Sequence, residues 1–446
     1  MTRDSSGMLN AFAEGNHLPA ETVALIERRK ALLGKSYRLF YAEPIHIVRG
    51  EGAWLFDASG RRYLDAYNNV ASVGHCHPRV VEAIRRQVAI LNTHTRYLDE
   101  NILDYCERLA TTLPPGLGRM VFTCSGSEAN DLALRIARYN TGASGVIVTR
   151  FAYHGVTEAT ARISPSLGAE SVGADNVRLV QAPDTYRLGE SAGAAFAEDV
   201  RTAVASLKAD GHGVAAMICD TIFSSDGVFV RRDLLSEAAR VVQEAGGLFV
   251  ADEVQAGFYR TGQFMWGAQR HGVVPDILTM GKPMGNGHPI AALALRAELA
   301  DRFGEHVRYF NTFGGNTVSI AAARATLDAI IDEGLGANAA TVGDWLGEEI
   351  LRLACEQDVI GDVRQAGLFL GVELVGNQDR RTPAAALAQA VVNQMRRLGV
   401  LISLTGTYGN VLKIRPPLIW GREHVDLFVA TLAQSLSEAR REIHDA

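Results

Sequence analysis

A single lysine follows an apolar run in the stretch PDILTMGKPMGNGHP, residues 275–289, and glycines and prolines come directly after it. Lysine is among the residues least often buried, unless a partner or a reaction neutralises its amine. A lone lysine at this position, Lys282, therefore calls for a group that partners or neutralises it. The alternative, a solvated surface lysine after a strand, stays open for this stretch taken alone.

Two carboxylates, Asp252 and Glu253, end the apolar stretch in GGLFVADEVQAG, residues 246–257. Because side chains alternate along a strand, we expect them on opposite faces with different partners. Ligands of open α/β sheets bind outside the carboxyl ends of the strands. Asp252 is thus a candidate for holding a ligand's positive charge, although backbone amides could equally satisfy both carboxylates. Lys282 follows at about the length of one β-α-β unit, which predicts both groups at one sheet edge.

A candidate anion site lies in MVFTCSGSEANDLALRIAR, residues 120–138, where a strand leads into Ser125-Gly126-Ser127 and then a helix. The free amides at a helix N-terminus bind phosphate well, and Gly126 leaves them approachable. An ordinary helix N-cap is the alternative. The stretch is not a P-loop, because GxxxxGK followed by Ser or Thr is absent.

Strands and helices that could position these groups alternate from about residue 79. The apolar strand candidates are MVFT, GVIVTR, AAMIC, GLFVA, DILTMG and AALALR. This alternation predicts an α/β fold in which a mostly parallel sheet is flanked by helices. We expect a large domain at 79–335 and a smaller α/β domain at 336–446, where helices flank LFLGVELV and VLISLTG. The N-terminal segment, 1–78, contains a small meandering sheet and is expected to join the smaller domain.

Composition narrows the class of protein. The net charge of −6, with acids and bases interspersed, indicates neither nucleic acid nor an anionic membrane as partner. Five scattered cysteines without CxxC spacing argue against disulfides and structural zinc, and the adjacent residues of GHCHP, 74–78, cannot readily close a metal site. No apolar run is long enough to span a membrane, and the polar start is unlike a signal peptide. We therefore expect a cytoplasmic enzyme without a metal.

Together, the lysine, the strand-end carboxylate and the anion site resemble the class III aminotransferase family, enzymes of fold type I that depend on pyridoxal 5′-phosphate. The resemblance covers nearly the whole chain. It implies that Lys282 bonds covalently to the cofactor aldehyde and that Asp252 holds the pyridine nitrogen. It also implies a homodimer, because a threonine of this family reaches the cofactor phosphate of the neighbouring subunit. The cofactor-binding residues implied by the motifs are Gly126, Ser127, Tyr153, Asp252, Val254, Gln255, Lys282 and Thr312.

The reaction must be inferred from the substrate pocket, because these residues serve both amino transfer and β-elimination. Many family members carry an arginine in the pattern RxxPP, where this chain has Lys413 in NVLKIRPPL. A lysine suits a phosphate better than a two-pronged carboxylate clamp. Asp220 also departs from the family pattern, which has glutamate followed by proline. Arg415, two residues beyond Lys413, cannot be assumed to replace the missing arginine.

With strings such as YNNVASVGHCHP and LNTHTRYLDEN, Lys413 makes the chain similar to the phospholyase branch of the family. This resemblance implies a phosphorylated amine as substrate, with phosphoethanolamine giving acetaldehyde, ammonia and phosphate. Asn69 and Arg96 are further candidates for the phosphate pocket. The alternatives are an aminotransferase that uses pyruvate or glyoxylate, and a cofactor-free binding protein, which would have no use for the pairing of Lys282 with Asp252.

Overall fold

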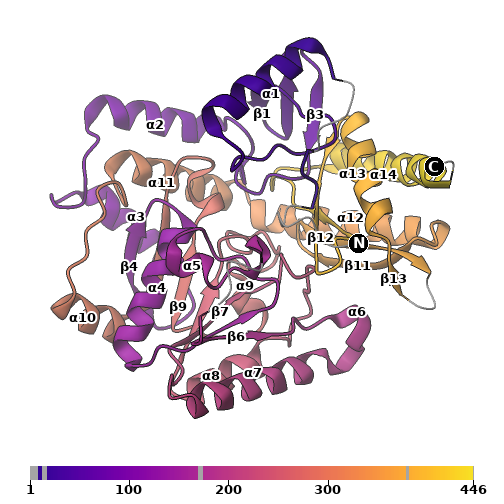
Figure 1. Ribbon diagram of the computed structural model, residues 1–446. Coiled ribbons are helices and arrows are strands. Elements are labelled where there is room, and N and C mark those ends of the chain that lie inside the picture. Colours follow the sequence, from indigo (N-terminus) through magenta and orange to yellow (C-terminus); the bar gives the residue numbers. More distant parts are fainter. Residues whose placement is uncertain (1–8, 13–17, 169–173, 378–380, 445–446) are drawn as a thin grey trace.

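A seven-stranded sheet forms the centre of the computed structural model, which describes residues 9–12, 18–168, 174–377 and 381–444 (Figure 1). The strand order is β4-β10-β9-β8-β7-β5-β6. In that order the strands span Leu117–Thr123, Ala291–Arg296, Ile277–Met280, Leu248–Asp252, Ala216–Asp220, Val146–Thr149 and Val177–Val180. β10 is antiparallel to both of its neighbours and the other pairs are parallel, so the predicted mostly parallel sheet is confirmed.

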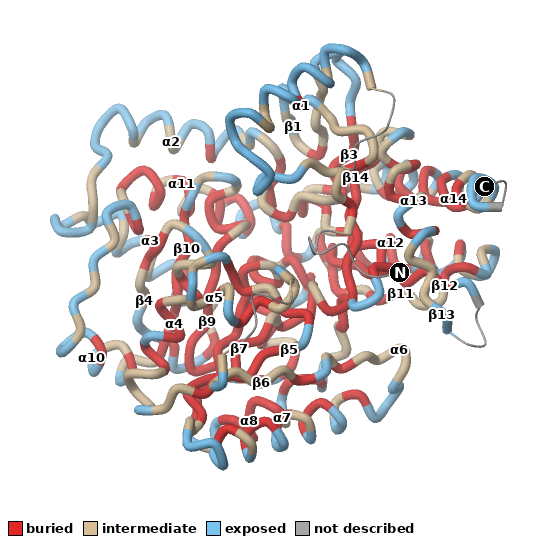
Figure 2. Tube along the Cα trace, viewed as in Figure 1, coloured by how far each residue is buried: buried red, intermediate tan, exposed pale blue. Residues whose placement is uncertain are grey.

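Helices cover both faces of this sheet. α7 and α8 pack on one face, in a hydrophobic cluster that includes Met217 and Phe249. α4 and α10 pack on the other face, in a cluster that includes Ile218 and Val250. These helices span Ala192–Ala209 (α7), Ser236–Glu244 (α8), Gly126–Thr141 (α4) and Ala297–His306 (α10). Because both faces are buried (Figure 2), the central strands are continuous apolar runs in the sequence.

Two smaller sheets lie beside the large one. The first has the order β1-β2-β3-β14, and its C-terminal strand β14 pairs in parallel with β3 of the N-terminal meander. Its strands span Ile47–Glu51, Trp54–Asp57, Arg62–Asp65 and Val400–Leu401. The second has the order β11-β12-β16-β15, with β13 beside β12. Its strands span Ile360–Ala366 (β11), Phe369–Asn377 (β12), Val411–Ile414 (β16), Ser403–Thr405 (β15) and Thr382–Pro383 (β13).

The remaining helices complete the architecture. They are α1 (Ala20–Leu33), α2 (Pro78–Ile90), α3 (Glu100–Ala110), α5 (Glu158–Ala161), α6 (Thr185–Leu188), α9 (Gly267–Arg270), α11 (Thr317–Asp332), α12 (Leu335–Glu356), α13 (Ala385–Arg397) and α14 (Arg422–His444). In the described ranges, no helix is long and apolar enough to cross a membrane. The polar start, at residues 1–8 and 13–17, lies outside the described residues.

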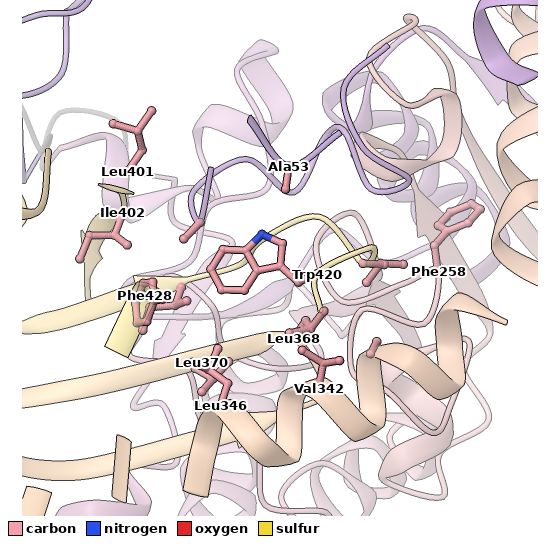
Figure 3. Packing of buried hydrophobic residues seen from close by; sticks show 14 of the residues in the cluster. Ala53, Phe258, Val342, Leu346, Leu368, Leu370, Leu401, Ile402, Trp420 and Phe428 are labelled. Atoms are coloured by element: carbon pink, nitrogen blue, oxygen red, sulfur yellow. The ribbon is translucent and has the colours of Figure 1, made fainter. Parts of the chain in front are cut away.

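Trp420 anchors the chain that follows β16. Its indole is fully buried against α12, β12 and α14 (Figure 3). The ring of Trp420 lies 5.8 Å from that of Phe428, centroid to centroid. The amide of Asn338 donates to the Trp420 carbonyl at 2.9 Å. Since β16 carries Lys413 and Arg415 follows it directly, this packing helps to hold both cations in place.

Candidate active site

The candidate catalytic groups meet at the carboxyl ends of β7, β8 and β9. Asp220 and Asp252 are register partners at the ends of β7 and β8, and Lys282 follows β9 after one glycine. They line one pocket with most of the predicted cofactor residues. The full lining is Gly126, Ser127, Asn130, Tyr153, His154, Gly155, Asp220, Asp252, Val254, Gln255 and Lys282. Only Thr312 of the predicted cofactor residues is outside this pocket.

Three donors hold the Asp252 carboxylate. His154 Nδ1 lies 2.7 Å and Asn130 Nδ2 2.9 Å from Asp252 Oδ2, while the backbone amide of Val254 donates to Oδ1 at 3.1 Å. The Thr279 hydroxyl donates to Asn130 Oδ1 at 2.6 Å, which turns the amide nitrogen of Asn130 toward Asp252. The carboxylate is therefore held in one orientation.

Asp252 is ionised although it is only 5% exposed. Burial raises the pKa of Asp252, but the hydrogen bond and charge of His154, with the charge of Lys282, outweigh burial and leave that pKa below its usual value. A buried negative charge at this point can stabilise a protonated ring nitrogen of a ligand.

The neighbouring Glu253 has a different role. Both of its carboxylate oxygens accept backbone amides at the start of α9, from Gly267 at 2.8 Å and Ala268 at 2.7 Å. The Thr221 hydroxyl donates to it at 3.1 Å. Burial raises the pKa of Glu253 to about 7. The alternative of a carboxylate satisfied by backbone amides therefore describes Glu253, and of these two neighbours only Asp252 lines the pocket.

The N-terminus of α4 forms a tight cradle in the pocket wall. Ser125 caps the helix, and Ser125 and Glu128 form a reciprocal capping box, so the ordinary N-cap is present. Gly126 packs so closely on Val254 that an added Cβ would lie 2.9 Å from a Val254 methyl carbon. A Cβ on Gly155 would lie 2.6 Å from the Ser127 hydroxyl oxygen. The glycines thus allow Val254 and Gly155 to pack closely on the N-terminus of α4. Ser127 Oγ accepts the Val156 amide at 3.2 Å, and its own proton can still be donated. This helix N-terminus lines the pocket and fits the phosphate group of pyridoxal 5′-phosphate.

Lys282 opens the short 3-10 helix η4 (Lys282–Gly285) directly after β9. Within the described part of the chain, its Nζ forms no hydrogen bond or ion pair. Burial lowers the pKa of Lys282, and the charge of Arg415 lowers it further, while Asp252 and Asp220 oppose the shift. A lysine with a lowered pKa carries more of the neutral amine, the form that can bond to an aldehyde or accept a proton.

A second pocket adjoins the first, because Tyr153 lines both. It contains Lys413, which is 5% exposed and whose Nζ lies 5.6 Å from the centre of the Phe369 ring. In the described chain no hydrogen bond or ion pair engages this amine. Burial holds the pKa of Lys413 well below its usual value, the charge of Arg415 adds to this, and Asp220 opposes it.

Arg415 lies in the same pocket but is already engaged. Its Nε donates to the Tyr67 carbonyl at 2.6 Å, and its Nη1 donates to Gln255 Oε1 at 3.2 Å. The guanidinium also lies over the Tyr67 ring, 4.7 Å from the centroid. Lys413 is thus the cation of this pair that is free to bind a ligand.

The other predicted residues lie elsewhere in the single chain. Asn69 is buried and lines neither pocket, and among the described residues its amide nitrogen has no partner. Arg96 and Thr312 are both exposed, and Arg96 lies over the Phe310 ring in a separate surface pocket. The shared intersubunit site expected for Thr312, and the substrate contacts expected for Asn69 and Arg96, stay predictions.

Sequence reasoning missed Asn130 and His154. Their only signals in the sequence were their positions, since Asn130 comes one helical turn after Gly126 and His154 follows Tyr153.

The histidines of GHCHP each pair with a carboxylate. His75 Nε2 lies 2.7 Å from Asp65 Oδ2 and His77 Nε2 lies 3.2 Å from Glu333 Oε1. Across the described residues, no group of three or more His, Cys, Asp or Glu side chains could hold a metal ion.

The chain is similar to known proteins over most of its length. The family model of class III aminotransferases matches residues 40–436. The chain is 40% identical to "Alanine--glyoxylate aminotransferase 2-like" of Drosophila melanogaster, covering 97% of this chain and 90% of the relative. It is 37% identical to "Ethanolamine-phosphate phospho-lyase homolog 1" of Caenorhabditis elegans, covering 94% of each.

A solved structure is also similar. It is a phospholyase from Arthrobacter in complex with phosphoethanolamine, with a TM-score of 0.89 and 44% identity over 93% of this chain and 99% of that one. The match of the family model over most of the chain and the strand-end Lys282 and Asp252 lead to one conclusion. The chain belongs to the class III aminotransferase family, the pyridoxal 5′-phosphate enzymes of fold type I.

Proposed function

We propose that this enzyme is a phospho-lyase that converts phosphoethanolamine to acetaldehyde, ammonia and phosphate. One observation carries the proposal: the pocket beside the cofactor site contains three cationic residues, Arg38, Lys413 and Arg415, and no carboxylate among its described lining residues. Such a pocket favours a doubly charged phosphate ester over a neutral amine. The phospholyase similar to this chain was solved with phosphoethanolamine, which supports the same substrate class.

Lys282, Asp252 and the α4 cradle would hold the cofactor. When bound, pyridoxal 5′-phosphate supplies an electron sink for negative charge on the carbon next to the substrate nitrogen. Asp252, held ionised by His154, strengthens that sink by keeping a positive charge beside it. The neutral amine of Lys282 accepts the proton from this carbon.

Lys413 has the second task, which is to hold the leaving group. The bond from the neighbouring carbon to the phosphate oxygen breaks, and the phosphate leaves with the electron pair. The carbon that lost the phosphate then gains a proton and becomes a methyl group, and water replaces the nitrogen. One phosphoethanolamine and one water thus give acetaldehyde, ammonia and phosphate. A phosphate dianion beside Lys413 favours the protonated amine, which opposes the effect of burial on the pKa of Lys413.

An aminotransferase is the second candidate, because similarity to alanine–glyoxylate aminotransferases is as high as to the phospho-lyase homologue. Arg415 lines the substrate pocket and could hold a carboxylate if it left Gln255. The products formed when purified holoenzyme is incubated with phosphoethanolamine and no keto acid distinguish a lyase from an aminotransferase. We expect equal amounts of phosphate and acetaldehyde. Amino transfer from alanine to glyoxylate, without phosphate release from any phosphorylated amine, would overturn the lyase proposal.

We further propose that the enzyme acts as a homodimer. Large apolar side chains around Arg96 and Thr312 are exposed, among them Tyr97, Leu98 and Phe313. Exposed apolar side chains that gather on one face of a protein can mark a protein interface. A partner subunit at this face would also give Thr312 a cofactor phosphate to reach.

A further inference from the structure

Asn10, in the N-terminal segment, lines the same pocket as Lys413. The residue is 5% exposed, and its side-chain Nδ2 is buried without a hydrogen-bond partner among the described residues. An unsatisfied buried donor costs free energy unless a ligand or water completes its hydrogen bonds. The amide of Asn10 therefore lacks an acceptor, which a bound polar group could supply.

Backbone contacts hold Asn10 against the body of the protein. Its carbonyl accepts the amide of Tyr41 at 3.0 Å, and Phe12 donates to the Leu39 carbonyl at 2.8 Å across the Ala11–Phe40 bridge. The Tyr41 hydroxyl in turn donates to the Ile402 carbonyl at 3.0 Å, next to β15. The segment is thus tied to the sheet that carries Lys413.

Leu9, the residue before Asn10, makes a second contact with the body of the protein. Leu9 packs at Gly409, where an added Cβ would lie 3.0 Å from a Leu9 methyl carbon. The loop at Gly409 joins β15 to β16. The contacts on either side of Asn10 thus reach Ile402, just before β15, and the loop between β15 and β16, the two strands that carry Ser403 and Lys413.

The chemistry of the pocket decides what the amide binds. Asn10 Nδ2 offers hydrogen-bond donors, and Lys413 Nζ offers donors that no described residue engages. Arg38 and Arg415 add positive charge, and no lining carboxylate competes for these donors. A negatively charged group with several acceptor oxygens can bind these donors and positive charges. A phosphate monoester has three such oxygens.

We propose that Asn10 is a substrate-binding residue whose amide donates to the substrate phosphate together with Lys413. This inference rests on the proposed function, because it assigns a residue to the same substrate site. It makes the N-terminal segment a determinant of specificity: the segment adds a neutral donor that a phosphate oxygen can use and that an apolar amine substituent cannot.

Two variants of the holoenzyme test this, with inorganic phosphate as the probe and its dissociation constant measured by calorimetry. Asn10→Leu removes the donors and keeps the branched shape of the side chain, and phosphate affinity should fall about tenfold. Asn10→Asp keeps the shape but places a negative charge against the phosphate, so affinity should fall further. Gln434→Leu, the same kind of change on the exposed face of α14, should leave affinity unchanged.

Turnover separates binding from a merely structural role. With phosphoethanolamine, KM should rise in both Asn10 variants, whereas the absorbance of the lysine-bound cofactor and the affinity for unphosphorylated ethanolamine should match wild type. Equal phosphate affinity in wild type and Asn10→Asp would overturn this inference, with water left as the partner of Asn10, while the lyase proposal would stand. A wild-type enzyme that neither binds phosphate nor releases it from phosphoethanolamine would overturn the proposed function instead.

Discussion

His154 Nδ1 lies 2.7 Å from Asp252 Oδ2, and both residues are almost fully buried beside Lys282. Burial raises the pKa of Asp252, and the contact with His154 opposes this effect and favours the ionised carboxylate. The pair therefore places a buried negative charge at the carboxyl end of β8, in the pocket that Lys282 also lines.

Removal of the Asp252 charge should impair catalysis strongly. Asp252→Asn keeps the size of the side chain but loses the charge that stabilises a protonated ring nitrogen. Turnover should fall about 100-fold or more, as expected when transition-state electrostatics are lost. His154→Ala should cause a smaller loss of turnover than Asp252→Asn. It should also shift the acidic limb of the pH profile to higher pH, because the pKa of Asp252 rises without its partner. Wild-type turnover in Asp252→Asn would mean that the ring nitrogen lies elsewhere.

Lys282 should carry the covalent bond to the cofactor. The wild-type protein is expected to be yellow, and borohydride should abolish the visible absorbance and leave the cofactor attached to Lys282, as mass spectrometry of peptides would reveal. Lys282→Ala should retain little turnover. Lys208→Ala, at an exposed lysine of α7, is the matched control and should behave as wild type. A colourless wild-type protein that stays colourless with added pyridoxal phosphate would contradict the assignment.

Lys413 should determine the use of the phosphorylated substrate. Lys413→Ala loses one charge-assisted hydrogen bond to the substrate. The activation free energy that corresponds to kcat/KM for phosphoethanolamine should therefore rise by about 1.5–3 kcal/mol. The cofactor absorbance should not change. Lys413→Arg should recover only part of the loss, since the two side chains differ in shape and hydration. If Lys413→Ala releases phosphate as fast as wild type, Lys413 does not bind the leaving group.

The exposed apolar face near Thr312 should form a dimer interface. Sedimentation at micromolar concentration is expected to give a dimer for wild type, and Leu98→Asp, at a fully exposed leucine, should dissociate it because the new charge would be buried. Thr312→Ala should weaken cofactor retention without dissociating the dimer. A fully active wild-type monomer would rule out a shared site.

Asp226 should make stability depend on pH. Burial raises the pKa of Asp226 to about 7, although the Thr149 hydroxyl and the Phe151 amide donate to it. An unfolded chain loses this proton near pH 4. The folded state therefore binds more protons than the unfolded chain between about pH 4 and pH 7. The contribution of Asp226 to the free energy of unfolding is fully present below this range and is lost as the pH rises through about 7.

The isosteric variant Asp226→Asn removes this titration. Its free energy of unfolding relative to wild type, measured by denaturant titration of the holoenzyme, should rise between pH 5 and pH 8. A difference that is independent of pH would show that Asp226 titrates near its usual value.

The sequence by itself determined the class of fold and the chemistry of the central pocket. Apolar strands covered on both faces by helices leave a distinctive pattern, because burial on two sides requires continuous apolar runs. Short edge elements such as β6 and β11 were missed, since an edge strand can carry polar residues like Arg178. The sequence also predicted the strand-end positions of Asp252 and Lys282, because the carboxyl ends of parallel strands meet at one edge of the sheet.

Only the tertiary structure decided which side chains complete the site. Asn130 and His154 meet Asp252 from a helix and a loop, contacts that depend on how α4 packs on the sheet and leave no local pattern. Asn10 and Lys413 are about 400 residues apart and share a pocket because the N-terminal segment pairs at Tyr41 beside β15. Spacing along the chain predicts neighbours within one β-α-β unit, whereas contacts between distant segments are set by the burial of whole surfaces.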